Sequence, residues 1–283
     1  MSILRKIDSV LVTLASAFLL VPVFIGSFFL ISAHFREQGD FLKLAPPTGR
    51  YIDFESERLF IQEQGANDGP AIVFVHGAGT WSELWAPTLK SLADEGFHCI
   101  AVDMPPFGFS LSPKSKIAFD RKTQAKRIFA VLDALKLKKV TLVGFSFGGR
   151  ATVTAALMQP ERIQRLILVN VSLGFGESKD ELPKPPSSFV RFALNLNLAR
   201  NILTSIATHP ALTSFLIEPF VVNPATLTDD VIEMFKKPFT IKSKSEEIGF
   251  WLQEVALTED HALIQDKKSY RGFTAPVHLI WGT

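Results

Sequence analysis

The residue best suited to act as a nucleophile is a serine held between two glycines. Residues 144–148 read Gly-Phe-Ser-Phe-Gly, with Gly144 and Gly148 on either side of Ser146. The apolar run Val140–Val143 precedes the motif and a helical pattern follows it, which is the setting of a nucleophile elbow. Such a turn exposes a serine hydroxyl that attacks a carbonyl carbon once a base accepts its proton. The alternative is a glycine-rich turn with an incidental serine.

A second glycine-containing loop is expected to stabilise the oxyanion of this reaction. His76, Gly77, Ala78 and Gly79 follow an apolar run. Glycines let such a loop fold back, so that a backbone N–H points at the developing negative charge. The expected donors are the N–H groups of Ala78 and Phe147. We expect His76 to brace the loop rather than to act as the base. A phosphate-binding role is weaker, because neither G-K-[ST] nor G-x-G-x-x-G occurs here.

The base and the acid that would activate the serine are not evident among these motifs. Asp103 ends an apolar run before a proline-rich turn and is expected to form that turn rather than to act in catalysis. The only adjacent acid–histidine pair is Asp260 and His261, in a region where a base is not expected. The remaining histidines are His34, His98, His209 and His278.

These motifs need a parallel sheet to position them, and the hydrophobic pattern predicts one. Short apolar runs alternate with helical patterns, which is typical of strands joined by right-handed helical crossovers. The predicted strands are a hairpin within residues 51–62 and the runs 71–76, 99–102, 140–143, 166–169 and 277–281. The predicted helices of this layer lie near residues 81–92, 125–135 and 149–158.

Residues 174–270 interrupt this alternation. They contain helical stretches and no convincing strand, so an inserted helical layer is predicted. Those stretches lie around 189–206, 211–222, 229–235 and 246–257. Their Phe and Leu side chains are expected either to line an apolar pocket or to pack the inserted layer.

The N-terminal region contains a run that is long enough to span a membrane. Residues 10–32 are 23 consecutive uncharged residues, and a spanning helix needs about 20. We expect residues 1–33 to form a single-pass anchor and residues 34–48 a polar linker. A cleavable signal peptide is the alternative, although its apolar core is usually shorter. Arg5 and Lys6 favour a cytoplasmic N-terminus, which would place the following domain on the non-cytoplasmic side.

Composition excludes several function classes. The chain has 283 residues, of which 47% are hydrophobic and 20% charged, so a disordered protein is excluded. Its formal net charge of +2 is too small to indicate a nucleic-acid surface. The single cysteine excludes an intrachain disulfide and a cysteine-cluster metal site. We expect no cofactor and no metal.

The two glycine loops and the Asp103 turn, in this order, make residues 51–283 resemble the α/β-hydrolase superfamily. The resemblance implies an α/β fold, namely a mostly parallel sheet with helices on both faces and a helical cap inserted after the sixth strand. It implies Ser146 as the nucleophile. Haloalkane dehalogenases and epoxide hydrolases of the superfamily use Asp at this position, so the serine argues against both. Esterases, lipases, thioesterases, carbon–carbon bond hydrolases and some peptidases remain.

The same resemblance implies a catalytic acid just after the strand at 277–281 and a histidine after one further strand. The printed sequence reaches Thr283 before either, so the C-terminal part of the 49–283 hydrolase domain is expected to be missing. The leading hypothesis is a membrane-anchored serine hydrolase that cleaves carboxylic esters, including lipid-like ones, with apolar groups. The alternative is a non-catalytic binding or scaffold protein at a membrane.

Overall fold

The computed structural model describes the backbone of residues 3–171, 186–257 and 266–282. Side chains are described from residue 20 onward within these ranges, apart from residues 116, 117 and 267.

A seven-stranded sheet forms the centre of the molecule, with strand order β1-β2-β4-β3-β5-β6-β7. β1 and β2 form an antiparallel hairpin, β2 pairs antiparallel with β4, and all remaining neighbours are parallel. The strands are β1 Gly49–Phe54, β2 Glu57–Gln64, β3 Ala71–Val75, β4 His98–Val102, β5 Val140–Phe145, β6 Ile163–Val169 and β7 Val277–Ile280. The predicted mostly parallel sheet is therefore confirmed.

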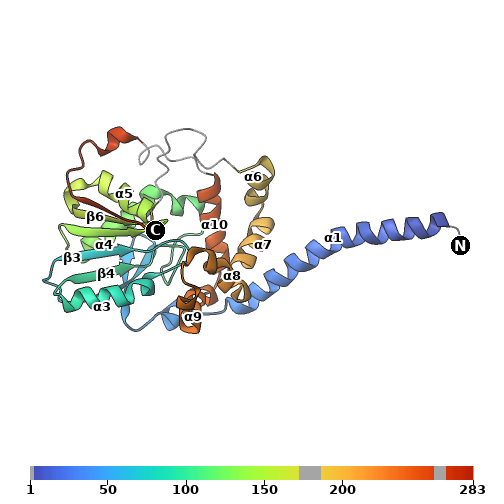
Figure 1. The fold of residues 1–283 in the computed structure, drawn as a ribbon, viewed down its shortest axis with the longest axis horizontal. Helices are drawn as coiled ribbons and strands as arrows, with labels where there is room; N and C mark the ends of the chain where they lie inside the picture. The colour runs from blue at the N-terminus through green and yellow to red at the C-terminus, as the bar shows by residue number, and fades with distance from the viewer. Residues whose placement is uncertain (1–2, 172–185, 258–265, 283) are drawn as a thin grey trace.

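Helices cover both faces of this sheet, as predicted (Figure 1). Leu89 of α3 (Ala86–Asp94) packs with Phe74 and Cys99 on one face. α4 (Arg121–Ala134) and α5 (Gly148–Met158) pack on the other face with the larger apolar cluster. Strands such as β3 are buried along their whole length, which explains why their sequences are continuous apolar runs.

In the described chain between β6 and β7, helices alternate with short turns and no strand occurs. Its helices are α6 Ser188–Asn195, α7 Asn197–Ala207, α8 Thr213–Ile217, α9 Asp229–Lys236 and α10 Lys244–Leu257. They form one side of the molecule (Figure 1), and we refer to α6–α10 as the cap. The stretch predicted around 189–206 is two helices, because Leu196 has an extended backbone with ψ 116°.

Short 3-10 helices connect many of these elements. They are η1 Ser82–Trp85, η2 Lys116–Phe119, η3 Pro160–Arg162, η5 Pro210–Leu212, η6 Glu218–Phe220, η7 Pro224–Thr226, η8 Lys237–Thr240 and η9 Lys267–Tyr270.

The N-terminal region forms α1 (Ile3–Arg36), which projects from the cap side of the molecule (Figure 1). Across the described residues, no helix is both long and apolar enough to cross a membrane. The spanning helix predicted over residues 10–32 therefore has no support in the structure. Residues 34–48, predicted as a linker, contain the end of α1 and the short helix α2 (Phe41–Leu44).

Candidate active site

Ser146 stands on a strained turn between β5 and α5. Its φ of 50° lies in the left-handed region, which side chains other than glycine adopt only under constraint. The Ser146 N–H donates to the Val169 carbonyl at 2.9 Å, which ties the turn to the end of β6. A Cβ on Gly144 would lie 2.7 Å from the Gly149 Cα, so the turn has no room for a side chain there.

The turn also lies directly against the loop that follows β3. A Cβ on Gly148 would lie 2.1 Å from the His76 carbonyl oxygen. A Cβ on Gly77 would lie 3.1 Å from the Ser146 Cβ. The structure thus brings together the two glycine loops that the sequence singled out, and the glycines permit this close approach.

The Gly77 carbonyl is held by three donors. The Thr80 hydroxyl donates to it at 3.0 Å and the Thr80 N–H at 3.4 Å. The His76 Nδ1 lies 2.7 Å from the same oxygen. In a planar trans peptide the C=O and the next N–H point in opposite directions. The Ala78 N–H therefore points away from His76 and Thr80, on the side left free by these contacts.

The Phe147 N–H is oriented in a similar way. The Ser146 carbonyl, in the same peptide group, accepts from the Gly149 N–H at 3.1 Å inside the first turn of α5. The Phe147 N–H then points outward from the helix N-terminus, where the helix dipole favours negative charge. Among the described residues, no hydrogen bond uses the N–H of Ala78 or of Phe147. Both donors are available to an oxyanion.

His76 is engaged at both ring nitrogens. The Met104 N–H donates to the His76 Nε2 at 2.8 Å, so Nε2 carries no proton and Nδ1 donates to the Gly77 carbonyl. Burial lowers the pKa of His76 to about 4, which keeps the ring neutral. This ring braces the loop through two backbone bonds and has no nitrogen left to accept a proton from Ser146.

Asp103 organises the turn after β4. Its Oδ1 accepts from the Ser82 N–H and its Oδ2 from the Phe109 N–H, both at 2.7 Å. Burial raises the pKa of Asp103 to about 6, while these donors and the charge of Lys244 act in the opposite direction. A Cβ on Gly108, whose φ is +63°, would meet the Asp103 carboxylate at 2.1 Å. Both carboxylate oxygens of Asp103 therefore accept hydrogen bonds from backbone N–H groups.

The other candidate bases do not reach the serine in the described chain. Within residues 20–171, 186–257 and 266–282, no hydrogen bond joins the Ser146 hydroxyl to a histidine. His98 is buried against Glu63 at 3.2 Å. The His209 ring packs on Phe29, with ring centroids 5.1 Å apart. Asp260 and His261 lie outside the described residues.

Aromatic rings from the cap and the core surround the elbow. The Trp251 ring of α10 lies 5.1 Å from the Phe147 ring and 5.0 Å from the Phe107 ring, both edge-on. The Trp85 ring lies 6.4 Å from that of Phe145 on the other side of the turn. The surroundings of Ser146 are therefore largely apolar.

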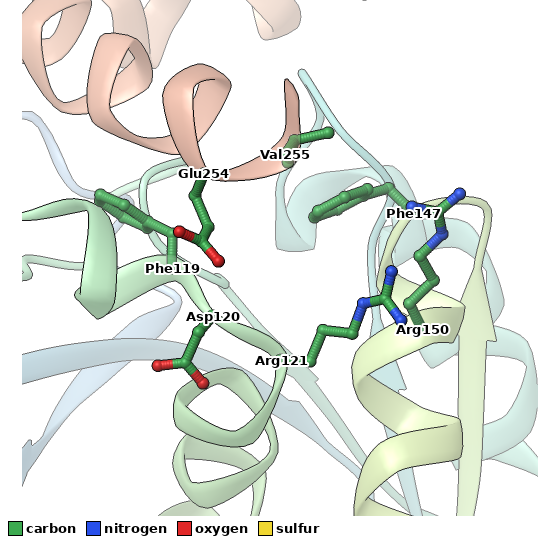
Figure 2. A pocket seen from close by; sticks show the side chains of 7 residues that line it. All are labelled: Phe119, Asp120, Arg121, Phe147, Arg150, Glu254 and Val255. Atoms are coloured by element: carbon green, nitrogen blue, oxygen red, sulfur yellow. The ribbon is translucent and has the colours of Figure 1, made fainter. Parts of the chain in front are cut away.

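A small pocket of about 30 Å³ opens beside Phe147 between α4, α5 and the cap (Figure 2). Charged side chains of both signs line much of it. Its lining residues are Phe119, Asp120, Arg121, Phe147, Arg150, Glu254 and Val255. Figure 2 shows Arg121 and Arg150 on one side and Glu254 descending from the cap. Ser146 is not among the lining residues, so this pocket is a neighbour of the elbow and not its centre.

Two further observations concern metal ligands and the single cysteine. In the part of the chain that the structure describes, no group of three or more His, Cys, Asp or Glu residues could hold a metal ion. Cys99 is buried, which raises the pKa of its thiol to about 11.

Two side chains that shape the site were not singled out from sequence. Thr80 fixes the Gly77 carbonyl, and its place just after Gly79 was the only available signal. Trp251 has no sequence signal, because it reaches Phe147 from the cap, more than 100 residues along the chain.

Comparisons with known proteins agree with this geometry. A family model described as alpha/beta hydrolase fold matches residues 70–283. An epoxide hydrolase from Caballeronia sordidicola is 34% identical over 113 residues, or 40% of this chain and 34% of that protein. A 2-hydroxymuconate semialdehyde hydrolase from Pseudomonas sp. (strain CF600) is 31% identical over 175 residues, or 57% of this chain and 60% of that protein. The chain thus spans from about a third to three fifths of these relatives.

Solved structures match more of the fold. The wild-type Cfl2 protein from Burkholderia cenocepacia superposes with a TM-score of 0.67 at 22% identity, covering 83% of this chain and 81% of that one. The epoxide hydrolase CorEH superposes with a TM-score of 0.67 at 20% identity, covering 83% and 82%. At these identities the likeness concerns the fold alone. The fold, the elbow geometry and the family model lead to one assignment: this chain belongs to the α/β-hydrolase fold family and is related to hydrolases.

Proposed function

We propose that this protein is a serine hydrolase that cleaves carboxylic esters with apolar groups. One observation carries the proposal: Ser146 stands on a strained elbow beside two backbone N–H groups, those of Ala78 and Phe147, that have no acceptor in the described chain. Two oriented donors beside a partly exposed serine suit the tetrahedral intermediate of acyl transfer.

In the proposed reaction, the Ser146 Oγ attacks the ester carbonyl carbon and its proton passes to a histidine base. The carbonyl oxygen becomes an oxyanion that accepts hydrogen bonds from the Ala78 and Phe147 N–H groups. Collapse of the intermediate breaks the ester bond, and the alcohol leaves with the proton from the base. Water then releases the acid from the acyl-enzyme and restores Ser146.

The base in this scheme comes from the resemblance and not from the described residues. His76 has both nitrogens engaged by backbone groups, so it is unsuited to the role. The family layout assigns the acid and the base to positions after β7. The direct test is to read the coding sequence beyond Thr283. An acid followed by a histidine there supports the hydrolase, and a chain without them supports the binding-protein alternative.

Apolar ester substrates are proposed because aromatic rings enclose the elbow. Phe107, Phe147 and Trp251 pack edge-to-face between core and cap. An acyl or alcohol group that enters this region leaves water for an aromatic surface, which is favourable at about 25 cal/mol per Å² of apolar area. Activity should therefore rise with acyl chain length in a series of p-nitrophenyl esters.

Carbon–carbon bond hydrolysis is the second candidate. It is favoured by the 31% identity to the 2-hydroxymuconate semialdehyde hydrolase and by Arg121 and Arg150 in the pocket beside Phe147. Guanidinium groups there suit an anionic part of a substrate. An Arg150→Gln variant tests this: it should lose activity on carboxylate-bearing substrates and keep activity on neutral esters, whereas equal loss on both would argue against an anion-binding role.

We further propose that residues 10–32 attach the protein to a membrane, with the hydrolase domain on the non-cytoplasmic side. The support is the 23-residue uncharged run. Retention of the protein in membranes after alkaline washing supports the attachment, and its release as soluble protein argues against it. Digestion of the domain by protease in spheroplasts supports the orientation, and protection there argues against it.

A further inference from the structure

The described part of the cap exposes many large apolar side chains. We call this set the cap surface; it comprises Phe189, Val190, Phe192, Leu196, Leu198, Leu203, Phe215, Leu216, Phe220 and Val222. The exposed fraction is 76% for Phe189, 88% for Phe220 and 93% for Val222. Contiguous exposed apolar areas on a soluble monomer are small, and larger ones mark interaction sites.

The charge pattern of this region is equally unusual. Residues 188–222 contain only three charged side chains, Arg191, Arg200 and Glu218. Arg200 is 3% exposed and lies over the Phe250 ring at 4.2 Å, so it adds nothing to the outer surface. Because the cap surface has few charged side chains, a partner can bind it without complementary charges of its own.

α1 continues this apolar character beyond the cap. Its described part exposes Leu20, Val21, Val23, Phe24, Ile25, Phe28, Ile31 and Phe35. α1 packs on α7, where Gly26 approaches the Ile202 side chain so closely that a Cβ would lie 3.1 Å from it. The Phe29 ring contacts the ring of His209, which follows α7 in the chain.

A buried polar network fixes the end of α1 to the cap. Arg36 pairs with Glu37 at 2.8 Å, with side chains only 9% and 8% exposed. The Arg36 guanidinium also donates to the Thr208 hydroxyl at 2.8 Å. The Glu37 carboxylate accepts from the N–H and the hydroxyl of Ser245 in α10. Breaking such a buried network is costly, so it fastens the C-terminal end of α1 to the cap.

We propose that the cap surface docks on the lipid bilayer to which α1 is attached, with its phenylalanines inserted among the lipid headgroups and upper acyl chains. This inference rests on the proposed membrane attachment. A bilayer fits better than a second copy of the chain because the uncharged run 10–32 lies within α1, which projects from the cap side (Figure 1). Apolar side chains of this kind bind interfaces through buried apolar area, and zwitterionic lipid suffices.

Site-directed fluorescence on the full chain tests the inference. The only native cysteine, Cys99, is buried, so Phe189→Cys and Phe220→Cys can each be labelled with an environment-sensitive NBD group. The matched control is Lys139→Cys, which is exposed just before β5, at the end of that strand away from the Ser146 elbow. Phosphatidylcholine vesicles should shift NBD emission at 189 and 220 to the blue and protect it from iodide. Emission at 139 should not change.

Flotation of the same samples separates the inference from the attachment on which it rests. Chains that float with vesicles but keep water-like NBD emission at 189 and 220 overturn the cap docking and leave the attachment standing. Chains that do not float overturn both. A blue shift without vesicles, together with a dimer mass, assigns the cap surface to a second copy and also overturns the proposal.

Discussion

Replacing Gly148 by alanine should separate the two loops that carry the proposed oxyanion donors. The added Cβ would lie 2.1 Å from the His76 carbonyl oxygen, whereas ordinary contacts are 3.4 Å or longer. The obstacle is backbone, so no side-chain rotation relieves it. Either the 76–79 loop or the start of α5 must move by roughly 1 Å, and a displacement of that size in a catalytic site lowers activity by about 100-fold.

Losing one oxyanion donor gives a similar figure, about 10²–10³-fold in kcat, or roughly 3–4 kcal/mol of transition-state stabilisation. We therefore expect Gly148→Ala to lower kcat/KM for p-nitrophenyl butyrate by at least 100-fold in the full-length protein. The matched control is Gly272→Ala, because a Cβ there meets nothing within 4 Å. Thermal melting of both variants checks that the protein stays folded. Wild-type kcat/KM in a folded Gly148→Ala variant would refute the reasoning, as would an equal loss in Gly272→Ala.

Three further predictions concern stability, pH and specificity. Arg127→Met should destabilise the protein by about 3–5 kcal/mol in urea unfolding, because it leaves Glu57 buried without its bidentate partner; Lys90→Ala, in an exposed pair, should change stability by less than about 1 kcal/mol. Burial lowers the pKa of His76 to about 4 in the folded protein. As pH falls, this histidine is therefore protonated in the unfolded chain before it is protonated in the folded protein. Stability relative to His76→Gln should fall by about 3 kcal/mol between pH 7 and 4, and a pH-independent difference would contradict the buried neutral ring. Trp251→Ala should reduce kcat/KM for octanoate esters about tenfold more than for acetate esters; equal losses would argue against an aromatic acyl site.

The sheet and its covering helices could be predicted because their side chains are sorted by burial. β3 and β4 are buried along their whole length and appear in sequence as short apolar runs. α4 buries Ile128 and Leu132 on one face, and its apolar spacing marks that face. These signals are local, so the alternation of strands and helices could be counted along the chain.

The N-terminal region was harder because its partners are distant. Residues 34–48 are polar in sequence and predicted a linker, yet Arg36 and Glu37 are buried against the cap. Their partners, Thr208 and Ser245, lie more than 170 residues away. No glycine or proline marks the break at Leu196, so the sequence predicts residues 189–206 as a single helical stretch.

The candidate site also combines features that have a local sequence signal with features that depend on tertiary packing. Gly144, Gly148 and the serine between them follow a local pattern, and so does the loop that begins at His76. The clamp on the Gly77 carbonyl and the contact of Trp251 with Phe147 depend on tertiary packing. The role of Ser146 as nucleophile stays a prediction, although the geometry around it is the one that the role requires.

The central claim is that Ser146 is an activated nucleophile, and covalent labelling tests it most directly. The full-length protein is incubated with a fluorophosphonate probe and the adduct is located by peptide mass spectrometry, with Ser146→Ala as the control. We predict a single adduct on Ser146 and none in the variant. A folded full-length protein that takes no label, or takes it at another residue, would contradict the claim.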